Sequence, residues 1–76
     1  MVHAFIMTKT APGASETVVR DVTELEQVEE AHVVAGEFDV IVEVDVDEVY
    51  DVMQAASVEI QGIDGVTDTK TYISLH

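Results

Sequence analysis

The alternation of apolar and polar positions predicts four β-strands. Residues 40–46 carry valine at every second position, and this period of two is typical of a half-buried strand. Three further strands are predicted at 2–10, 28–35 and 66–75. The first of these is rich in β-branched and aromatic residues, and the last is rich in threonine. The turn Gly36-Glu37-Phe38-Asp39 separates the second strand from the third.

Two segments between these strands show the spacing of amphipathic helices. The first covers residues 15–26, and we expect Ser15 to cap its amino terminus. The second follows Asp47, which we expect to be its cap, and it ends at the glycine-containing turn 62–65. Apolar side chains recur every three or four residues in both segments. They are Val18, Val19, Val22 and Leu25 in the first, and Val49, Val52, Met53, Ala56 and Ile60 in the second.

The elements follow one another as strand, helix, strand, strand, helix, strand. The linker 36–39 is too short for a crossover, so the two strands that flank it form an antiparallel hairpin. Right-handed crossovers then place both helices on one face of a four-stranded antiparallel sheet. The sequence therefore predicts the α+β class and a ferredoxin-like βαββαβ fold, with residues 1–76 as a single domain.

The sheet face without helices is expected to be apolar as well. The first strand is apolar on both sides, whereas a strand with one face in water should alternate. Its apolar residues are Val2, Ala4 and Ile6 on one side and Phe5 and Met7 on the other. On the last strand, period two places Val66 and Tyr72 on one face, and the opposite face carries Thr69, Thr71, Ile73 and Leu75. Such a surface is too apolar for a monomer, and we predict that it packs against the same face of a second copy.

The composition narrows the class of protein further. Sixteen acidic and three basic residues give a net charge of -13, which disfavours contact with a nucleic-acid backbone. We interpret this acidity as a surface adapted to very high salt; a patch for a basic partner and a calcium site are the alternatives. Asp45, Asp47 and Asp51 lack the spacing and central glycine of a calcium loop. A domain this small buries little surface, and without cysteine it cannot be stabilised by disulfides. Oligomerisation is the remaining source of stability.

Catalytic chemistry has little support in the residues. His3, His32 and His76 are far apart in sequence, and we interpret them as structural or solvent-facing, not as catalytic groups or metal ligands. Neither Ser15 nor Ser57 has a base beside it in sequence. No signal peptide and no apolar run of membrane-spanning length is visible. We therefore expect a cytoplasmic protein that is not an enzyme and carries no cofactor.

Two polar segments are candidate binding elements. The turn 36–39 offers backbone N–H groups and the Asp39 carboxylate, which suit a small zwitterion. The segment 67–71 offers threonine hydroxyls, which donate or accept hydrogen bonds. The alternatives are ordinary hairpin chemistry for the turn and β-propensity for the threonines.

These segments resemble the effector-sensing domain of the leucine-responsive regulatory protein (Lrp)/AsnC family. The similar stretches are residues 5–13, the segment 33–40 with its glycine–aromatic–aspartate turn, and the segment 65–71, which begins Gly-Val and is rich in threonine. The resemblance implies dimers that form a β-sandwich, often assembled into octamers, with an amino-acid effector bound between subunits. Carried onto this sequence, the binding residues are Gly36, Phe38, Asp39, Thr69 and Thr71, together with Glu37 and Asp68.

Full-length members of that family carry an amino-terminal helix-turn-helix, whereas this chain begins at the first strand. The resemblance is therefore to a stand-alone sensing domain or a fragment, without direct binding of nucleic acid. We expect an amino-acid-sensing module that regulates transcription indirectly, by co-assembly with full-length relatives. The alternative is a structural or scaffold subunit that binds no small molecule. An acylphosphatase-like enzyme is disfavoured, because the chain has no asparagine and Arg20 lies within the first predicted helix.

Overall fold

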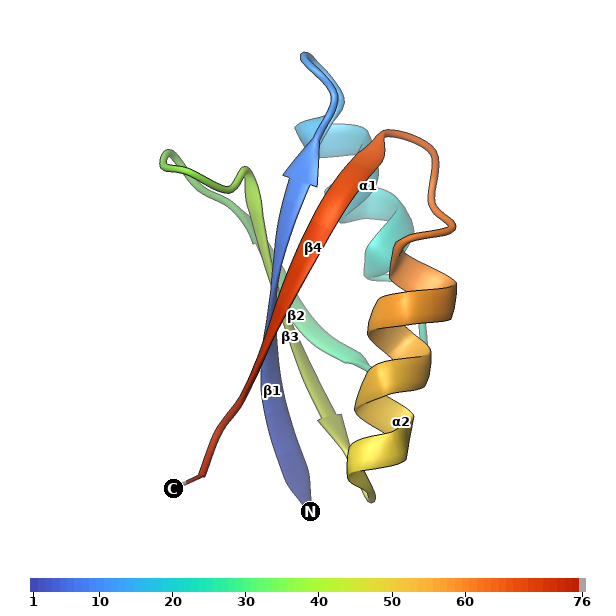
Figure 1. Ribbon diagram of the computed structural model, residues 1–76. Helices are drawn as coiled ribbons and strands as arrows, with labels where there is room; N and C mark the ends of the chain where they lie inside the picture. Colours follow the sequence, from blue (N-terminus) through green and yellow to red (C-terminus); the bar gives the residue numbers. More distant parts are fainter. Residues whose placement is uncertain (76) are drawn as a thin grey trace.

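The computed structural model describes residues 1–75, and it confirms the predicted α+β architecture (Figure 1). Four strands form one antiparallel sheet in the order β2-β3-β1-β4. Both helices cover one face of the sheet, as in the ferredoxin-like fold, and the other face is open (Figure 1). The elements are β1 (Val2–Thr10), α1 (Ser15–Val22), β2 (Val28–Val33), β3 (Val40–Val46), α2 (Val49–Gln54), its π-helical continuation η1 (Ala55–Ile60) and β4 (Val66–Ile73).

The core between the sheet and the helices is aliphatic. Alternate residues of β1 and β3 are buried against the helices. For residues 40–46, this confirms the burial expected from their alternating valines. Thr8 is the buried polar residue among those described, and its hydroxyl donates a hydrogen bond to the Ile6 carbonyl (3.2 Å). The buried apolar residues are Ala4, Ile6, Val18, Val22, Val40, Val42, Val44, Val52, Ala55, Ala56 and Ile60.

Helix α1 differs from its prediction at both ends. The N-cap is Ala14, and the Ser15 hydroxyl lies 3.0 Å from that of Thr10 instead of capping the helix. The helix ends at Val22, because the Thr23 hydroxyl donates to the Arg20 carbonyl (2.9 Å) and the chain tightens into turns. The predicted helix extending to residue 26 is therefore four residues too long.

Helix α2 begins one residue later than predicted. Glu48, not Asp47, is the N-cap, and its backbone N–H donates to the Asp51 carboxylate (3.2 Å). The predicted apolar stripe is partly wrong, since Val49 is 48% exposed and Met53 is 58% exposed. The helix instead buries Val52, Ala55, Ala56 and Ile60, so the predicted positions Val52, Ala56 and Ile60 are confirmed.

Two strands end earlier than predicted and contain bulges. β2 stops at Val33 and β4 at Ile73, two residues short in each case. Between β1 and β4, Thr10 pairs with Val66 and Lys9 pairs with Asp68, so Thr67 is an extra residue in β4. This bulge turns Val66 towards the core and leaves Tyr72 on the open face, which corrects the prediction that the two share a face.

The strand pairing defines the open face, which is the sheet surface away from the helices. In β1 it begins with His3, because Ala4, Ile6 and Thr8 are the buried side of that strand. Its members are His3, Phe5, Met7 and Lys9 in β1, Ile41, Glu43 and Asp45 in β3, Glu30 and His32 in β2, and Asp68, Lys70 and Tyr72 in β4. In the described part of the chain, no helix is long and apolar enough to cross a membrane.

Candidate ligand-binding site

Asp39 fastens the loop between β2 and β3 to the neighbouring strand β1. Its carboxylate accepts a hydrogen bond from the Thr10 N–H (2.9 Å), and its own N–H donates to the Thr8 carbonyl (3.0 Å). Its carbonyl accepts from the Val34 N–H (2.9 Å), which closes the loop on itself. The carboxylate that the sequence offered as a ligand for a zwitterion is therefore already engaged in holding the loop.

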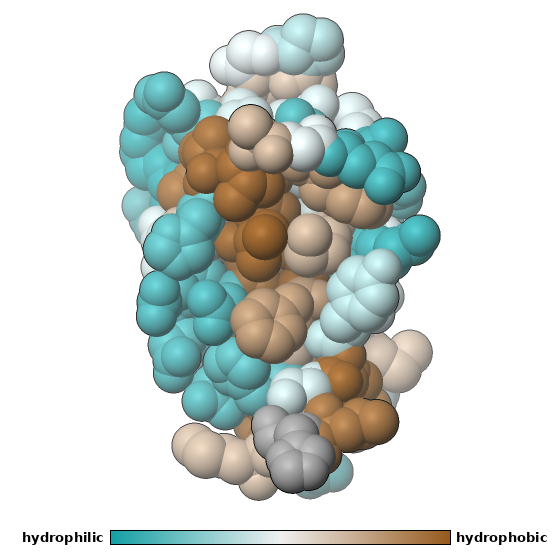
Figure 2. Space-filling view, turned by 90° about the vertical axis from the view of Figure 1, so that its left-hand side faces the viewer, coloured by the Kyte–Doolittle hydropathy of each residue, from teal (hydrophilic) through white to brown (hydrophobic). Residues whose placement is uncertain are grey.

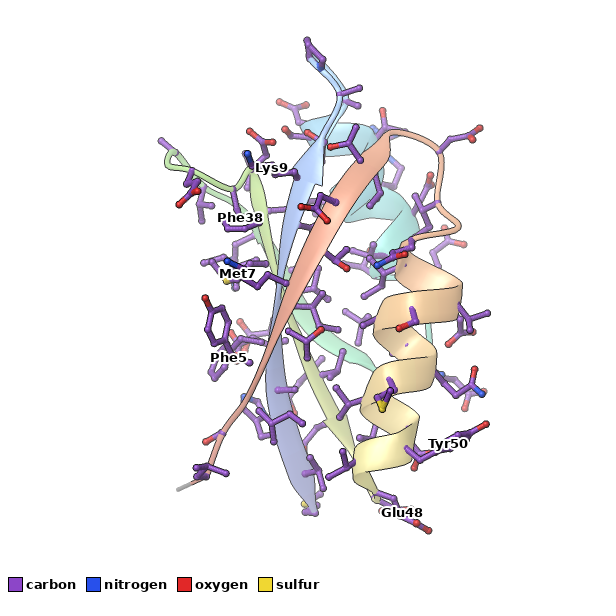
Figure 3. All side chains as sticks on the ribbon, viewed as in Figure 1. Phe5, Met7, Lys9, Phe38, Glu48 and Tyr50 are labelled. Carbon is purple, nitrogen blue, oxygen red and sulfur yellow. The ribbon has the colours of Figure 1, made fainter. Side chains whose placement is uncertain are left out.

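The rest of the loop is presented to solvent beside the open face. Gly36 and Glu37 are exposed, whereas Phe38 is half-buried. The Lys9 ammonium lies 5.8 Å from the centre of the Phe38 ring, within the range of a cation–π interaction. Both side chains point away from the helices (Figure 3). A Cβ on Gly36 would meet no atom within 4 Å, so the fold itself does not require glycine there.

The three candidate residues of β4 divide between the two faces of the sheet. Asp68 lies opposite Lys9 in the strand pairing and belongs to the open face, where its carboxylate accepts a bond from the Thr69 N–H (2.9 Å). Thr69 and Thr71 face the helix side, opposite Thr8 and Ile6. The Thr69 hydroxyl accepts a hydrogen bond from the Gln61 side chain (2.7 Å), so it links the end of the second helix to β4.

The structure thus brings the loop and the start of β4 to the same end of the sheet, with β1 between them (Figure 1). Asp68 lies on the open-face side of that end and Phe38 points away from the helices (Figure 3), whereas the two threonines face the helix side. Sequence reasoning missed Lys9 and Thr10, which connect these segments. The available signal was that Lys9 is one of only three basic residues in the chain.

Apolar and hydrophilic residues separate on the open face. Figure 2 shows a brown apolar strip down the middle and a hydrophilic band along the side where β2 lies. Phe5 and Met7 project from β1 into the open side (Figure 3), and Ile41 pairs with Met7. These three side chains are half-buried, and Tyr72 on β4 is 54% exposed. The strip is the apolar surface that the sequence predicted for this face.

A cavity of about 620 Å³ lies at the opposite end of the sheet from the loop. None of the seven predicted site residues lines it. Its wall is acidic, with carboxylates from Glu24, Glu26, Asp45, Asp47, Asp51 and Glu59. Such a wall repels the carboxylate of a free amino acid, so this cavity is a poor site for one.

The sequence matches a known family over almost its whole length. Residues 3–76 match the model of the Lrp/AsnC ligand binding domain. No curated protein matches the chain.

Solved structures of similar proteins share the fold. The hypothetical protein PHS023 from Pyrococcus horikoshii is 36% identical, with a TM-score of 0.90, and the match covers 100% of this chain and 92% of that one. Escherichia coli AsnC is 22% identical, with a TM-score of 0.90, over 99% of this chain and 51% of its own. The transcriptional regulator NMB0573 from Neisseria meningitidis, solved as a complex with L-Met, is 18% identical, with a TM-score of 0.87. That match covers 99% of this chain and 50% of the regulator. This chain therefore corresponds to about half of each of these two longer proteins.

Proposed function

The chain belongs to the Lrp/AsnC ligand-binding domain family, and we propose that it is an amino-acid-sensing module whose ligand controls its assembly. The observation that carries the proposal is the apolar open face, flanked at one end by the exposed loop 36–39 and the Lys9 ammonium. One longer protein that shares this fold was solved with L-Met, which supports a free amino acid as the ligand class. AsnC shares the fold over half its chain, and this supports indirect regulation of transcription through co-assembly with such longer relatives.

The first step is dimerisation through the open face. Its central strip of Phe5, Met7 and Ile41 is an apolar patch on a protein of 76 residues, and covering it removes that area from water. A second copy related by a two-fold axis presents an identical strip, so the surfaces match without a separate partner. The lack of cysteine also leaves association as the available source of added stability.

The second step is ligand binding at the loop end of the sheet. The Lys9 ammonium and the loop N–H groups suit the ligand carboxylate, and the exposed carboxylates of Glu37 and Asp68 suit its ammonium group. Asp39 acts by holding the loop against Thr10 and not by touching the ligand. Gly36 leaves the loop backbone open to close approach. The remaining wall of the pocket comes from a neighbouring subunit.

The third step couples binding to assembly. A ligand enclosed between subunits binds the assembled state more tightly than the dispersed state, so it shifts the population towards assembly. The same linkage stabilises the fold. A ligand present at 100 times its dissociation constant adds about 2.7 kcal/mol. For a domain of this size, that raises the unfolding midpoint by roughly 10–20 °C.

A thermal-shift panel of the twenty free amino acids tests the proposal. We expect a rise confined to a few chemically related amino acids. In K9Q the rise should disappear, because the ligand carboxylate loses its cation. The matched control is K70Q, which removes the same charge from the same face of the sheet, one strand away and opposite Met7. In K70Q the amino acid should still raise the unfolding temperature. A panel that is flat for the wild type would overturn the proposal.

A scaffold subunit without a small-molecule ligand is the second candidate, and one observation favours it. The outer side of the second helix exposes Tyr50, Met53 and Val58, which line a shallow, mostly apolar depression of about 190 Å³. Tyr50 points away from the sheet in Figure 3. Large exposed apolar residues gathered on one surface are typical of protein contacts. A flat amino-acid panel, combined with binding to a longer relative that M53E abolishes, would establish this function instead.

A further inference from the structure

Two histidines and four carboxylates gather on the β2 side of the open face, outside the proposed amino-acid site. They form the hydrophilic band in Figure 2. The ligand atoms of His3, Glu29 and Asp45 lie within 4.8 Å of one another, and so do those of Glu30, His32 and Glu43. Sequence reasoning treated the histidines as separate structural residues, because His3 and His32 are far apart along the chain.

A bulge in β2 explains how one strand supplies acidic groups to both sets. Val28 pairs with Val44 and Glu30 pairs with Glu43, so Glu29 is an extra residue on the β2 side. Two residues then face one partner, and Glu29 reaches His3 and Asp45 although its neighbour Glu30 also belongs to the open face. Without the bulge, successive residues would point to opposite faces of the sheet.

The ring of His3 is held in the orientation that a metal ligand needs. Its Nε2 lies 3.2 Å from a Glu43 carboxylate oxygen, and its edge-to-face contact with Phe5 has a centroid distance of 5.0 Å. When Nε2 donates to Glu43, the lone pair of Nδ1 is left facing the Asp45 carboxylate at 3.9 Å. A carboxylate behind the imidazole is the usual outer partner of a metal-bound histidine.

The spacing between Nδ1 and Asp45 is too long for a hydrogen bond, but it suits a cation between two acceptors. With bonds of about 2.1 Å in tetrahedral geometry, nitrogen and oxygen ligands lie about 3.4 Å apart. Small side-chain rotations close the remaining gap. Within residues 1–75, no lysine or arginine forms a salt bridge with Glu29, Glu43 or Asp45, so no such side chain competes with a metal ion for these carboxylates.

We propose that His3, Glu29 and Asp45 bind a divalent transition-metal ion of the Zn²⁺ class, with Glu43 orienting the imidazole. A nitrogen ligand beside carboxylates favours zinc over magnesium or calcium, which prefer oxygen alone. Three protein ligands leave one tetrahedral position for water or for another subunit. The proposal does not depend on the amino-acid ligand, since the cluster shares no residue with that site.

Isothermal titration of the chelator-treated protein with Zn²⁺, at one fixed salt concentration, tests the site. Zinc is the probe because Cu²⁺ and Ni²⁺ favour square-planar coordination by nitrogen. These two ions can bind the amino-terminal segment that ends in His3 even when the protein is unfolded. We expect one Zn²⁺ per chain. H3Q and D45N should each weaken binding at least a hundredfold, and E43Q by about tenfold, as for outer partners elsewhere.

H32Q and H76Q are the matched controls. His32 belongs to the adjacent set, and His76 lies outside the described residues; both variants should keep the wild-type affinity. D45N tests the site independently of the histidine. The proposal is wrong if the wild type binds no Zn²⁺, if H3Q and D45N bind as tightly as the wild type, or if H32Q loses as much affinity as H3Q.

Discussion

Asp39 is the residue whose removal tests most sharply how the binding loop is held. The variant D39A deletes the acceptor of the Thr10 N–H bond, which is 2.9 Å long and half-buried. A hydrogen bond to a charged group contributes about 1.5–3 kcal/mol when its partner is left buried. Because water reaches part of this site, we expect a loss of about 2 kcal/mol. That corresponds to a midpoint lower by roughly 8–16 °C.

Removing a carboxylate also relieves repulsion in a chain with a net charge of -13, which acts in the opposite direction. E37A measures that contribution, because Glu37 lies exposed in the same loop. D39N keeps an oxygen acceptor but loses its charge, so it should cost about half as much as D39A. The measurement is thermal and denaturant unfolding of the variants at the same salt concentration, with hydrogen exchange of the Thr10 amide as a local readout.

If D39A is no less stable than E37A and its Thr10 amide exchanges at the wild-type rate, the Asp39 carboxylate does not hold the loop. A faster exchange of that amide without global destabilisation would show that the loop opens independently of the core. Where the loop opens, D39A should also lose its ligand-dependent stabilisation, because Asp39 holds the loop without contacting the ligand.

Three further changes test the fold, the loop and the dimer. G65A should cost about 2 kcal/mol in unfolding experiments, because Gly65 has φ +97° and a Cβ there would lie 3.0 Å from that of Ala14. G36A should unfold within about 0.5 kcal/mol of the wild type, because nothing lies within 4 Å of the added methyl group, yet it should reduce the ligand-dependent thermal shift. M7E should yield monomers by light scattering while M53E, the same change on the helix side, keeps the wild-type mass; equal masses for the two variants would exclude the open face as the dimer interface.

The sequence was sufficient for the fold because the strand signals are strong. The alternating valines of residues 40–46 could only bury one side, and the short linker before them required a hairpin. Helix ends were less predictable. Asp47 and Ser15 have the side chains of good caps, but Glu48 and Ala14 occupy those positions, since tertiary packing decides where the chain turns into the helix.

The site was harder to predict, because face and register are set by bulges that the apolar pattern does not reveal. Thr67 and Glu29 are each one extra residue in a strand, and each changes which side chains share a face. The bulge at Thr67 turns Val66 towards the core, although Asp68 and Tyr72 lie on the open side. Thr69 was offered as a ligand-binding residue but is engaged by Gln61 on the helix side. The hydrogen bond from the Thr10 N–H to the Asp39 carboxylate could not be predicted from the sequence either, because the two residues are far apart along the chain.

The mass of the wild-type protein, measured by light scattering with and without each stabilising amino acid, tests the central claim most directly. We expect dimers in the absence of ligand and a larger, defined assembly when the ligand is present, with K9Q remaining dimeric under both conditions. A mass that stays the same with every amino acid would contradict the claim that the ligand controls assembly.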